Sequence, residues 1–331
     1  MIFLHSMMQF TNNQGRIKRR GREETAIIPK RVKKRNFTIF LSIIPHELVL
    51  LILELISRRD LIELASTSKA IRCVLELYLF SHVKTSWCDL LSIWNDQGKP
   101  AGISKPNLIE KLRLTTCCSQ NEWTFPFAEL LKGNLTRLEL CTSGSTNFFK
   151  YTSEGCQLRV LQVHAVKPGS VFNLEHLVPF ARLQKLLLHD FEIEAFDEND
   201  WCPHLSTLEL DDCTWRYPFQ LENFGRDKID TLCLHYTNHF VMSERFRMFL
   251  NGPHFRRLRH LSITNREKNL KLTLSVHIMK LIESIPTLRT LELRGNIYNE
   301  TLNNFTSSDW ENCISYVGVR DVKVFYSSFL N

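Results

Sequence analysis

The chain has 331 residues, enough for about two domains, and its 42 lysines and arginines against 35 acids give a formal charge of +7. Residues 1–36 hold ten basic and two acidic side chains, which sum to +8, so the rest of the chain carries −1, the difference between +7 and +8. With 44% apolar residues that remainder can bury a core, which excludes global disorder. A basic charge that would indicate nucleic-acid binding therefore applies to the tail alone.

Several other classes of protein lack support in the sequence. The 12 glycines are roughly half the usual share, which leaves little material for phosphate-binding loops, and no catalytic motif is present. The longest apolar stretch, residues 39–56, is interrupted by Pro45 and by charged residues, so it does not predict a membrane span. The ten cysteines form no C-x-x-C pair. We therefore expect no enzyme activity, no cofactor and no metal, and a location in the nucleus or cytoplasm.

Residues 1–39 are expected to form a disordered basic tail, because they lack apolar periodicity. The tail contains two basic clusters separated by nine residues, namely Lys18, Arg19 and Arg20, followed by Lys30, Arg31, Lys33, Lys34 and Arg35. This spacing resembles a bipartite nuclear import signal, which an importin-like carrier would bind. A solvated tail that adheres weakly to RNA or acidic surfaces is the alternative.

Residues 40–85 have a helical pattern. Leu48, Leu51, Ile52, Leu55 and Ile56 recur at i, i+3, i+4, i+7 and i+8, which predicts one apolar face of a helix. The helix would start after Pro45, Asp60 would cap a second helix, and residues 66–68 would cap a third. Three such short helices need a partner surface, because their own core is small.

This helical segment resembles an F-box. The residues that carry the resemblance are Ile44-Pro45-His46-Glu47-Leu48, then Asp60-Leu61, then Thr67-Ser68-Lys69-Ala70-Ile71-Arg72, with Ile44 in place of the family's leucine. The resemblance implies that the helices bind a Skp-type adaptor. By family analogy the contact residues would be Ile44, Pro45, Leu48, Ile52, Leu55, Leu61 and Leu64. An ordinary helical cap on the next domain is the alternative.

After a linker at residues 86–104, residues 105–331 carry a repeated hexad of the form L-x-x-L-x-L at intervals of 22 to 30 residues. The nine copies begin at Ile109, Leu135, Leu158, Leu183, Leu205, Ile229, Leu258, Leu288 and Ile314. This pattern is typical of leucine-rich repeats. It predicts an α/β fold in which stacked parallel strands line the concave side of a solenoid and short helices the convex side. Candidate helices are residues 127–131, 174–178, 246–250 and 276–282.

The hexads also predict which polar side chains share the outward face of the strands. The position after each hexad is Thr115, Cys141, His164, His189, Asp211, His235, Thr264, Arg294 and Arg320. Two residues earlier the series is Arg113, Glu139, Gln162, Leu187, Glu209, Cys233, Ser262, Glu292 and Gly318. The candidate substrate-binding residues are His164, His189, Glu209, Asp211, His235 and Arg294. A zinc site is a weaker alternative, because side chains in such a ladder diverge.

An F-box followed by leucine-rich repeats resembles the substrate receptors of SCF-type (Skp–cullin–F-box) ubiquitin ligases. The resemblance implies a non-catalytic subunit that binds a Skp-type adaptor, reaches a cullin through it and holds an unknown protein substrate. Such a receptor acts by raising the effective concentration of the substrate near the conjugating enzyme. Two alternatives stay open, a ligase-independent nuclear scaffold and a nucleic-acid-binding protein anchored by the basic tail.

Overall fold

The computed structural model describes residues 44–86, 106–118, 131, 133–142, 149, 156–167, 169–194, 202–216, 228–237, 256–267, 269, 271–300, 304–305, 313–317 and 323–325. The chain divides into two compact units, residues 1–81 and residues 82–331. Both basic clusters of the tail lie outside the described residues, as do the predicted helix at 246–250 and all of the one at 127–131 except Leu131.

The first unit contains three α-helices. These are α3 (His46–Leu55), α4 (Arg58–Thr67) and α5 (Lys69–Ser81). Pro45 precedes α3, where its fixed φ suits a helix start. The cap of α4 is Ser57, whose hydroxyl oxygen accepts from the backbone N–H of Asp60. Asp60 was predicted to be the cap, but it lies in the first turn of the helix. Ser68 accepts from Ile71 and caps α5, as the sequence predicts.

The core of the first unit takes two residues from each helix: Val49, Leu53, Leu61, Ala65, Ile71 and Leu75. On α3 the inward pair is Val49 and Leu53, four residues apart and therefore on one face. The unit ends at Ser81, earlier than the predicted residue 85. Residues 82–85 instead form a strand of the second unit, because Val83 packs against the solenoid core.

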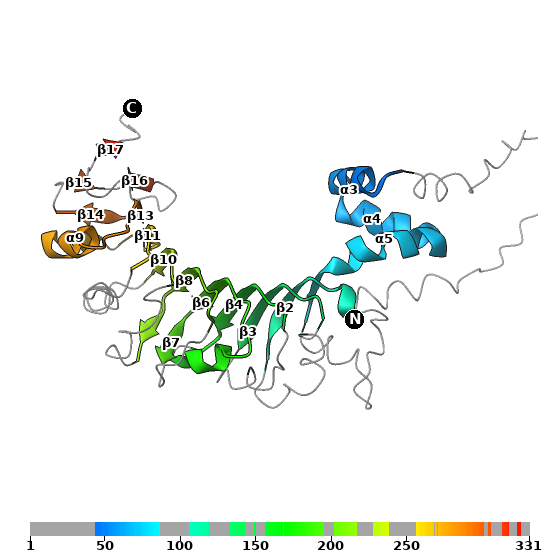
Figure 1. Cartoon of the computed structure of the whole chain (residues 1–331), viewed down its shortest axis with the longest axis horizontal. Coiled ribbons are helices and arrows are strands. Elements are labelled where there is room, and N and C mark those ends of the chain that lie inside the picture. Colours follow the sequence, from blue (N-terminus) through cyan, green and yellow to red (C-terminus); the bar gives the residue numbers. More distant parts are fainter. Residues whose placement is uncertain are drawn as a thin grey trace, which may run out of the picture. The chain divides into compact units, whose positions relative to one another are not determined.

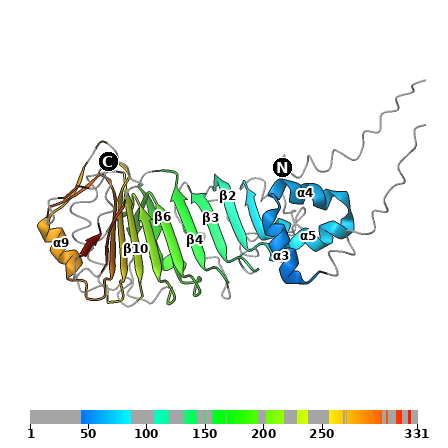
Figure 2. The same ribbon diagram turned by 90° about the horizontal axis from the view of Figure 1, so that it is seen from above.

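The second unit is built on an 11-stranded sheet whose strands lie side by side (Figure 1, Figure 2). In spatial order the strands are β1 (His82–Thr85), β2 (Lys111–Cys118), β3 (Arg137–Thr142), β4 (Val160–Ala165), β6 (Lys185–His189), β8 (Thr207–Asp211), β10 (Thr231–Tyr236), β11 (His260–Asn265), β13 (Thr290–Gly295), β16 (Cys313–Val317) and β17 (Lys323–Phe325). From β1 to β13 every neighbouring pair is parallel. The prediction of a mixed α/β protein with a parallel-strand solenoid is confirmed.

The leucine hexads explain this stacking. In each of the first eight copies all three apolar positions are buried. The strand of the 11-stranded sheet that carries each of these copies begins two residues after the start of the hexad. The second position of each copy lies in register with that of the next strand, as in Leu138, Leu161 and Leu186. Since a strand alternates its side chains between two faces, one leucine-rich face forms a continuous core and the other face stays polar.

The return segments contain strands as well as helices. Two small sheets occur there, β5 (Ser170–Asn173), β7 (Phe191–Glu194) and β9 (Thr214–Trp215), and β12 (Leu272–Leu274), β14 (Ile297–Asn299) and β15 (Asn304–Phe305). The predicted helices at 174–178 and 276–282 correspond to the 3-10 helix η3 (Leu174–Leu177) and to α9 (Val276–Glu283). A further 3-10 helix, η1 (Pro106–Leu108), precedes β2. The expectation of helices alone on this side was therefore too simple.

Sharp corners join the main strands to the return strands. Asp190, Asp212 and Gly295 have φ of 61°, 50° and 87°, and each lies at or just after the end of a main strand. A positive φ reverses the chain within one or two residues, and glycine and aspartate tolerate it best. The return segments lie on one face of the sheet, and no described helix or strand of the second unit covers the other face, the open face (Figure 1).

The ninth hexad does not continue the parallel stack. Its strand, β16, pairs with β13 in the antiparallel direction, and β17 pairs antiparallel to β16. The strand β15 likewise runs antiparallel to β14. The sequence pattern at Ile314 matches the repeat, yet the strand that carries it, β16, runs opposite to β13.

Candidate functional site

The open face presents two rows of side chains that cross the strands. The outer row is Cys141, His164, His189, Asp211, His235, Thr264 and Arg294. The inner row is Arg113, Glu139, Gln162, Leu187, Glu209, Cys233, Ser262 and Glu292. In both rows, the residues that the sequence predicts to be side by side on adjacent strands are side by side in the structure, because the parallel strands stack in the register that aligns their leucines.

The two ends of the rows differ from the sequence prediction. A register shift in β2 between Arg113 and Cys117 places Cys117 beside Cys141, so Thr115 is not part of the outer row. At the other end the antiparallel strand β16 places Cys313 opposite Arg294 and Ser315 opposite Glu292. The predicted end residues, Gly318 and Arg320, lie outside the described residues.

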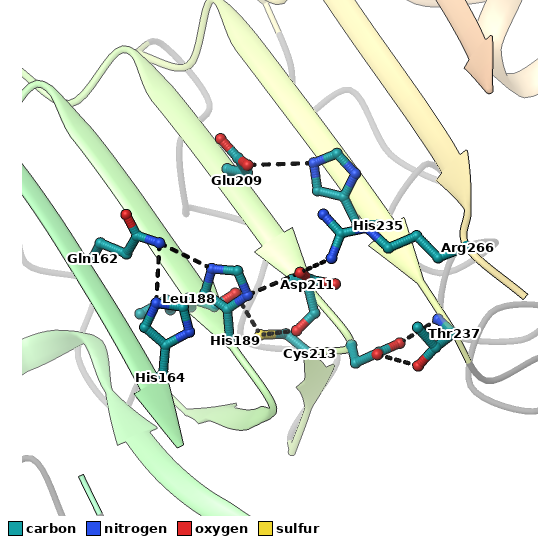
Figure 3. A network of polar contacts seen from close by, with 11 residues as sticks. Gln162, His164, Leu188, His189, Glu209, Asp211, Cys213, His235, Thr237 and Arg266 are labelled. Atoms are coloured by element: carbon teal, nitrogen blue, oxygen red, sulfur yellow. Dashed lines mark hydrogen bonds and ion pairs between the residues drawn. The ribbon is translucent and has the colours of Figure 1, made fainter. Parts of the chain in front are cut away.

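A histidine pair occupies the outer row on β4 and β6. The rings of His164 and His189 stack with centroids 3.9 Å apart and an interplanar angle of 14°. The Gln162 amide nitrogen lies 3.0 Å from Nε2 of His164 and 3.4 Å from Nε2 of His189 (Figure 3). An amide N–H can only donate, so the Nε2 atoms of both rings are placed to accept from Gln162.

The pKa of His164 is lowered to about 4. Burial is the largest cause, and repulsion from Arg113 and from His189 when its ring is protonated adds to it, against the opposing effect of Asp211. His164 is therefore neutral near pH 7, which agrees with its role as an acceptor from Gln162.

Asp211 connects the histidine pair to an arginine. Its Oδ2 lies 2.8 Å from Nδ1 of His189 and also accepts from Arg266, whose side chain crosses β10 from the end of β11 (Figure 3). Burial alone would raise the pKa of Asp211, which is 6% exposed. The hydrogen bond from His189 and the charge of Arg266 outweigh burial and hold the pKa below its ordinary value. Asp211 is thus an ionised carboxylate buried in the open face.

Glu209 forms a second charged group in the inner row. Its carboxylate lies 3.4 Å from Nε2 of His235 and 3.1 Å from Nζ of Lys185. The hydrogen bond from His235 is the largest cause of its pKa of about 2, and the contact with Lys185 adds to it against the effect of burial. Both carboxylates at the centre of the face are therefore ionised and each is bound by a histidine.

Four consecutive residues of the outer row retain unused hydrogen-bonding atoms. Asp211 Oδ1, His235 Nδ1, Thr264 Oγ1 and Arg294 Nε are buried and have no hydrogen-bond partner among the described residues. Leaving such an atom without a partner costs folding free energy, about 1–3 kcal/mol for each in general. The centre of the open face is therefore polar, and its hydrogen-bonding capacity is only partly used within the chain.

The arrangement does not resemble a metal centre or a nucleophilic site. Within the described parts of the chain no group of three or more His, Cys, Asp and Glu residues is placed to hold a metal ion. Burial raises the pKa of Cys233 to about 11 and that of Cys213 to about 12. Both thiols are therefore protonated and unreactive at neutral pH. None of the helices in the described residues is long and apolar enough to span a membrane.

The first unit offers a different surface, on α3. Leu48, Leu51, Ile52 and Leu55 are 50%, 57%, 38% and 89% exposed, and their spacing places them along one side of the helix. We call these four residues the apolar stripe. The sequence pattern identified them as one face, and the structure shows that this face is turned to solvent and not to the core.

The other residues expected at the adaptor contact lie in mixed surroundings. Pro45 is exposed, whereas Ile44 and Leu64 are partly buried against the core of the first unit. Leu61 is 9% exposed and belongs to that core, so it is not part of the apolar stripe. Leu61 and Ala65 are four residues apart and form the buried side of α4.

Two residues that the sequence analysis did not select complete the site. Lys185 occupies an outward position at the start of β6, so the hexad pattern would have placed it on the same face as Glu209. Arg266 follows the last residue of β11 and reaches Asp211 two strands away, which strand alternation does not predict.

Comparison with known proteins adds no identity. No protein-family model and no curated protein matches the chain.

Proposed function

We propose that this chain is a non-catalytic substrate receptor of an SCF-type ubiquitin ligase. In this proposal α3 binds a Skp-type adaptor, and through it a cullin, while the open face of the solenoid binds a protein substrate. The observation that carries the proposal is the apolar stripe on α3, which coincides with the segment that resembles an F-box. Four large aliphatic side chains exposed along one helix form a patch that favours burial against a partner.

The second unit supports the substrate-binding half of the proposal. Its open face is broad, polar and free of described return segments, and its central side chains are held in place by ion pairs and hydrogen bonds. Side chains that are already ordered lose little conformational entropy on binding a partner. The proposed mechanism is tethering, which raises the local concentration of substrate lysines near a charged conjugating enzyme.

An affinity purification of the full chain tests the adaptor half. Wild type and Leu48→Asp/Leu55→Asp are expressed in the same cells, and co-purified adaptor and cullin are quantified by mass spectrometry. Both positions are exposed, so the aspartates leave the core of the first unit intact. We expect wild type to recover both partners and the variant to lose at least nine-tenths of each, because a buried unpaired carboxylate opposes apolar contact.

A matched control uses Val178→Asp, which puts the same charge on an apolar residue of the solenoid that is 58% exposed. This variant should recover the adaptor and cullin as well as wild type does. Recovery of the adaptor without cullin would replace the ligase with the ligase-independent scaffold. If wild type recovers neither partner, the proposed function is wrong.

A further inference from the structure

Ion pairing on the open face is nearly complete at its centre. Three carboxylates lie there, on β8 and β13, and each has a basic partner, in the pairs Glu209–Lys185, Asp211–Arg266 and Glu292–Arg294. The face from β6 to β13 is therefore close to electrically neutral, and a ligand charge gains little there without breaking a pair.

On the strands β1 to β3 the charged side chains of the open face are not all paired. Lys84 lies in register with Arg113, and Lys111 lies in register with Arg137, so like charges face each other across neighbouring strands. Among the described residues Lys84, Lys111 and Arg137 have no ion-pair partner, and Glu139 is the single carboxylate beside them on this face. Cross-strand pairs of like charge are unfavourable for the sheet. We call Lys84, Lys111, Arg113 and Arg137 the basic patch.

All four side chains of the basic patch project on the open face and are accessible. Val83, Leu112 and Leu138 face the core, so the alternate residues point away from it. Lys84, Lys111 and Arg137 are exposed, and the side chain of Arg113 is 58% exposed despite its contact with Glu139. The patch therefore meets solvent as a compact group of four cations.

We propose that the basic patch binds an acidic peptide segment of the substrate in an extended conformation. Side chains two residues apart on a strand project to the same side with a separation of about 6.6 Å, the same spacing that separates Lys111 from Arg113 along β2. Anionic groups at alternate positions of an extended peptide therefore match the patch along its strands. The anions are carboxylates of aspartate or glutamate, or phosphates of phosphorylated serine.

A peptide fits the patch better than a nucleic acid does. No Phe, Tyr or Trp occupies an outward position among the described residues of β1 to β4, so the bases of a single strand have no such platform on which to stack. The patch also spans only three strands, about 10 Å, and Glu139 borders it. A continuous phosphate backbone would require a longer basic track.

Fluorescence anisotropy of the full chain with labelled ten-residue peptides tests the proposal. One peptide alternates glutamate with serine, a second replaces glutamate with phosphoserine, and a third replaces it with glutamine. We expect the wild type to bind at least one anionic peptide, more weakly as salt rises, and not the glutamine peptide. The tighter of the two anionic peptides identifies the source of the anion. Lys111→Glu/Arg137→Glu should weaken binding at least tenfold.

Two controls separate the patch from the basic tail and from misfolding. Lys280→Glu makes the same type of charge change at an exposed site of α9 and should bind as wild type does. Lys111→Gln/Arg137→Gln, which adds no negative charge, should show an intermediate loss. A benzophenone-bearing copy of the bound peptide should cross-link to residues 82–142. Cross-linking to the tail, or equal affinity of wild type and both double variants, would overturn the proposal.

A single-stranded RNA of ten nucleotides serves as the competing ligand. If it binds more tightly than either anionic peptide and loses affinity in the same double variant, the patch is a nucleic-acid site and the peptide proposal is wrong. The inference rests on the proposed function only in treating the solenoid as the substrate-binding part. Its test needs neither adaptor nor cullin, so the failure of one proposal leaves the other standing.

Discussion

His164 and His189 lie on neighbouring strands with their rings stacked 3.9 Å apart, and Nε2 of each faces the same amide nitrogen of Gln162. Two protonated rings at this separation would repel each other and would lose the acceptor atoms that Gln162 uses. The ring of His164 is therefore neutral near pH 7, with its proton on Nδ1 and its Nε2 accepting from Gln162. On its far side Nδ1 of His189 donates a hydrogen bond to an ionised carboxylate, Asp211.

The first prediction concerns the titration of His164. Ring signals followed by NMR should give a pKa of about 4, because burial and the neighbouring positive charges disfavour protonation. His189→Gln removes one of these charges and should raise that pKa. His277→Gln, an exposed substitution on α9, should leave it unchanged. A wild-type pKa near 6.5 would show that the ring is solvated and that the stacked arrangement is wrong.

Acid should destabilise the second unit in two steps. The folded pKa of His164 lies below its ordinary 6.5, so the unfolded chain binds more protons and stability falls as pH drops from 6.5 towards 4. The folded pKa of Glu209 is depressed from 4.5 to about 2, so its contribution is present above 4.5 and is lost as pH falls towards 2. Each group contributes roughly 1 kcal/mol once solvent screening is allowed for.

Glu209→Gln isolates the lower of these two steps. Urea unfolding at pH 7 should show a loss of about 1 kcal/mol, and the dependence on pH between 4.5 and 2 should flatten. Glu139→Gln is the matched control, because Glu139 pairs only with the exposed Arg113 among the described residues. It should change stability by less than half as much. Equal effects of the two variants would mean that the contacts of Glu209 with His235 and Lys185 contribute nothing.

Much of the site could be predicted from the spacing of leucines. Once Leu186 and Leu208 are aligned in the core, strand alternation places His189 beside Asp211 and Leu187 beside Glu209 without further information. From β3 to β13, strand alternation gives the observed neighbours on the open face in the same way. It fails at β2, because the shift between Arg113 and Cys117 inserts residues that the leucine pattern does not reveal.

Other features depend on contacts that periodicity cannot supply. On α3 two apolar sets compete for the core. Four of the five residues of the predicted set are exposed and the fifth, Ile56, is partly buried, while Val49 and Leu53 are buried. Both sets have helical spacing, so only the packing of α4 and α5 decides between them. Arg266 lies outside its strand, and a long flexible side chain can reach several neighbours, so its contact with Asp211 had no signal in the sequence.

The corner residue Asp212 provides a third prediction. It has φ of 50°, and its carboxylate accepts from the backbone N–H and the hydroxyl of Thr237. Asp212→Ala loses both bonds and places alanine in the left-handed region, so we expect a loss of about 2 kcal/mol in urea unfolding. Asp212→Asn should lose less than half of that, because asparagine tolerates the same φ and keeps one acceptor.

Asp190→Ala separates the two causes at these corners. Asp190 has φ of 61° at the end of β6, but no hydrogen bond from a neighbouring turn to its carboxylate is present among the described residues. In this variant the only loss of stability should come from placing alanine in the left-handed conformation. The free energy of unfolding should therefore fall less than in Asp212→Ala. An equal loss in both variants would show that the bonds to Thr237 add no stability.

The last prediction concerns Thr264, which lies in the outer row between His235 and Arg294. The residue is 1% exposed, and its hydroxyl has no hydrogen-bond partner among the described residues. Valine has nearly the same shape, suits a strand and removes the unpartnered hydroxyl. Thr264→Val should therefore leave the free energy of unfolding unchanged or raise it by about 1 kcal/mol.

Thr287→Val supplies the matched control for this substitution. The Thr287 hydroxyl donates to the carbonyl oxygen of Leu258 at 2.8 Å, so its removal should cost about 1 kcal/mol. Urea unfolding of both variants beside wild type gives the comparison. Changes in the free energy of unfolding of opposite sign in the two variants would show that the Thr264 hydroxyl destabilises the folded chain. Such a cost is expected of a group that forms its hydrogen bond only with a bound ligand. Equal losses in the two variants would show that Thr264 is already satisfied, and the outer row would then hold less unused hydrogen-bonding capacity.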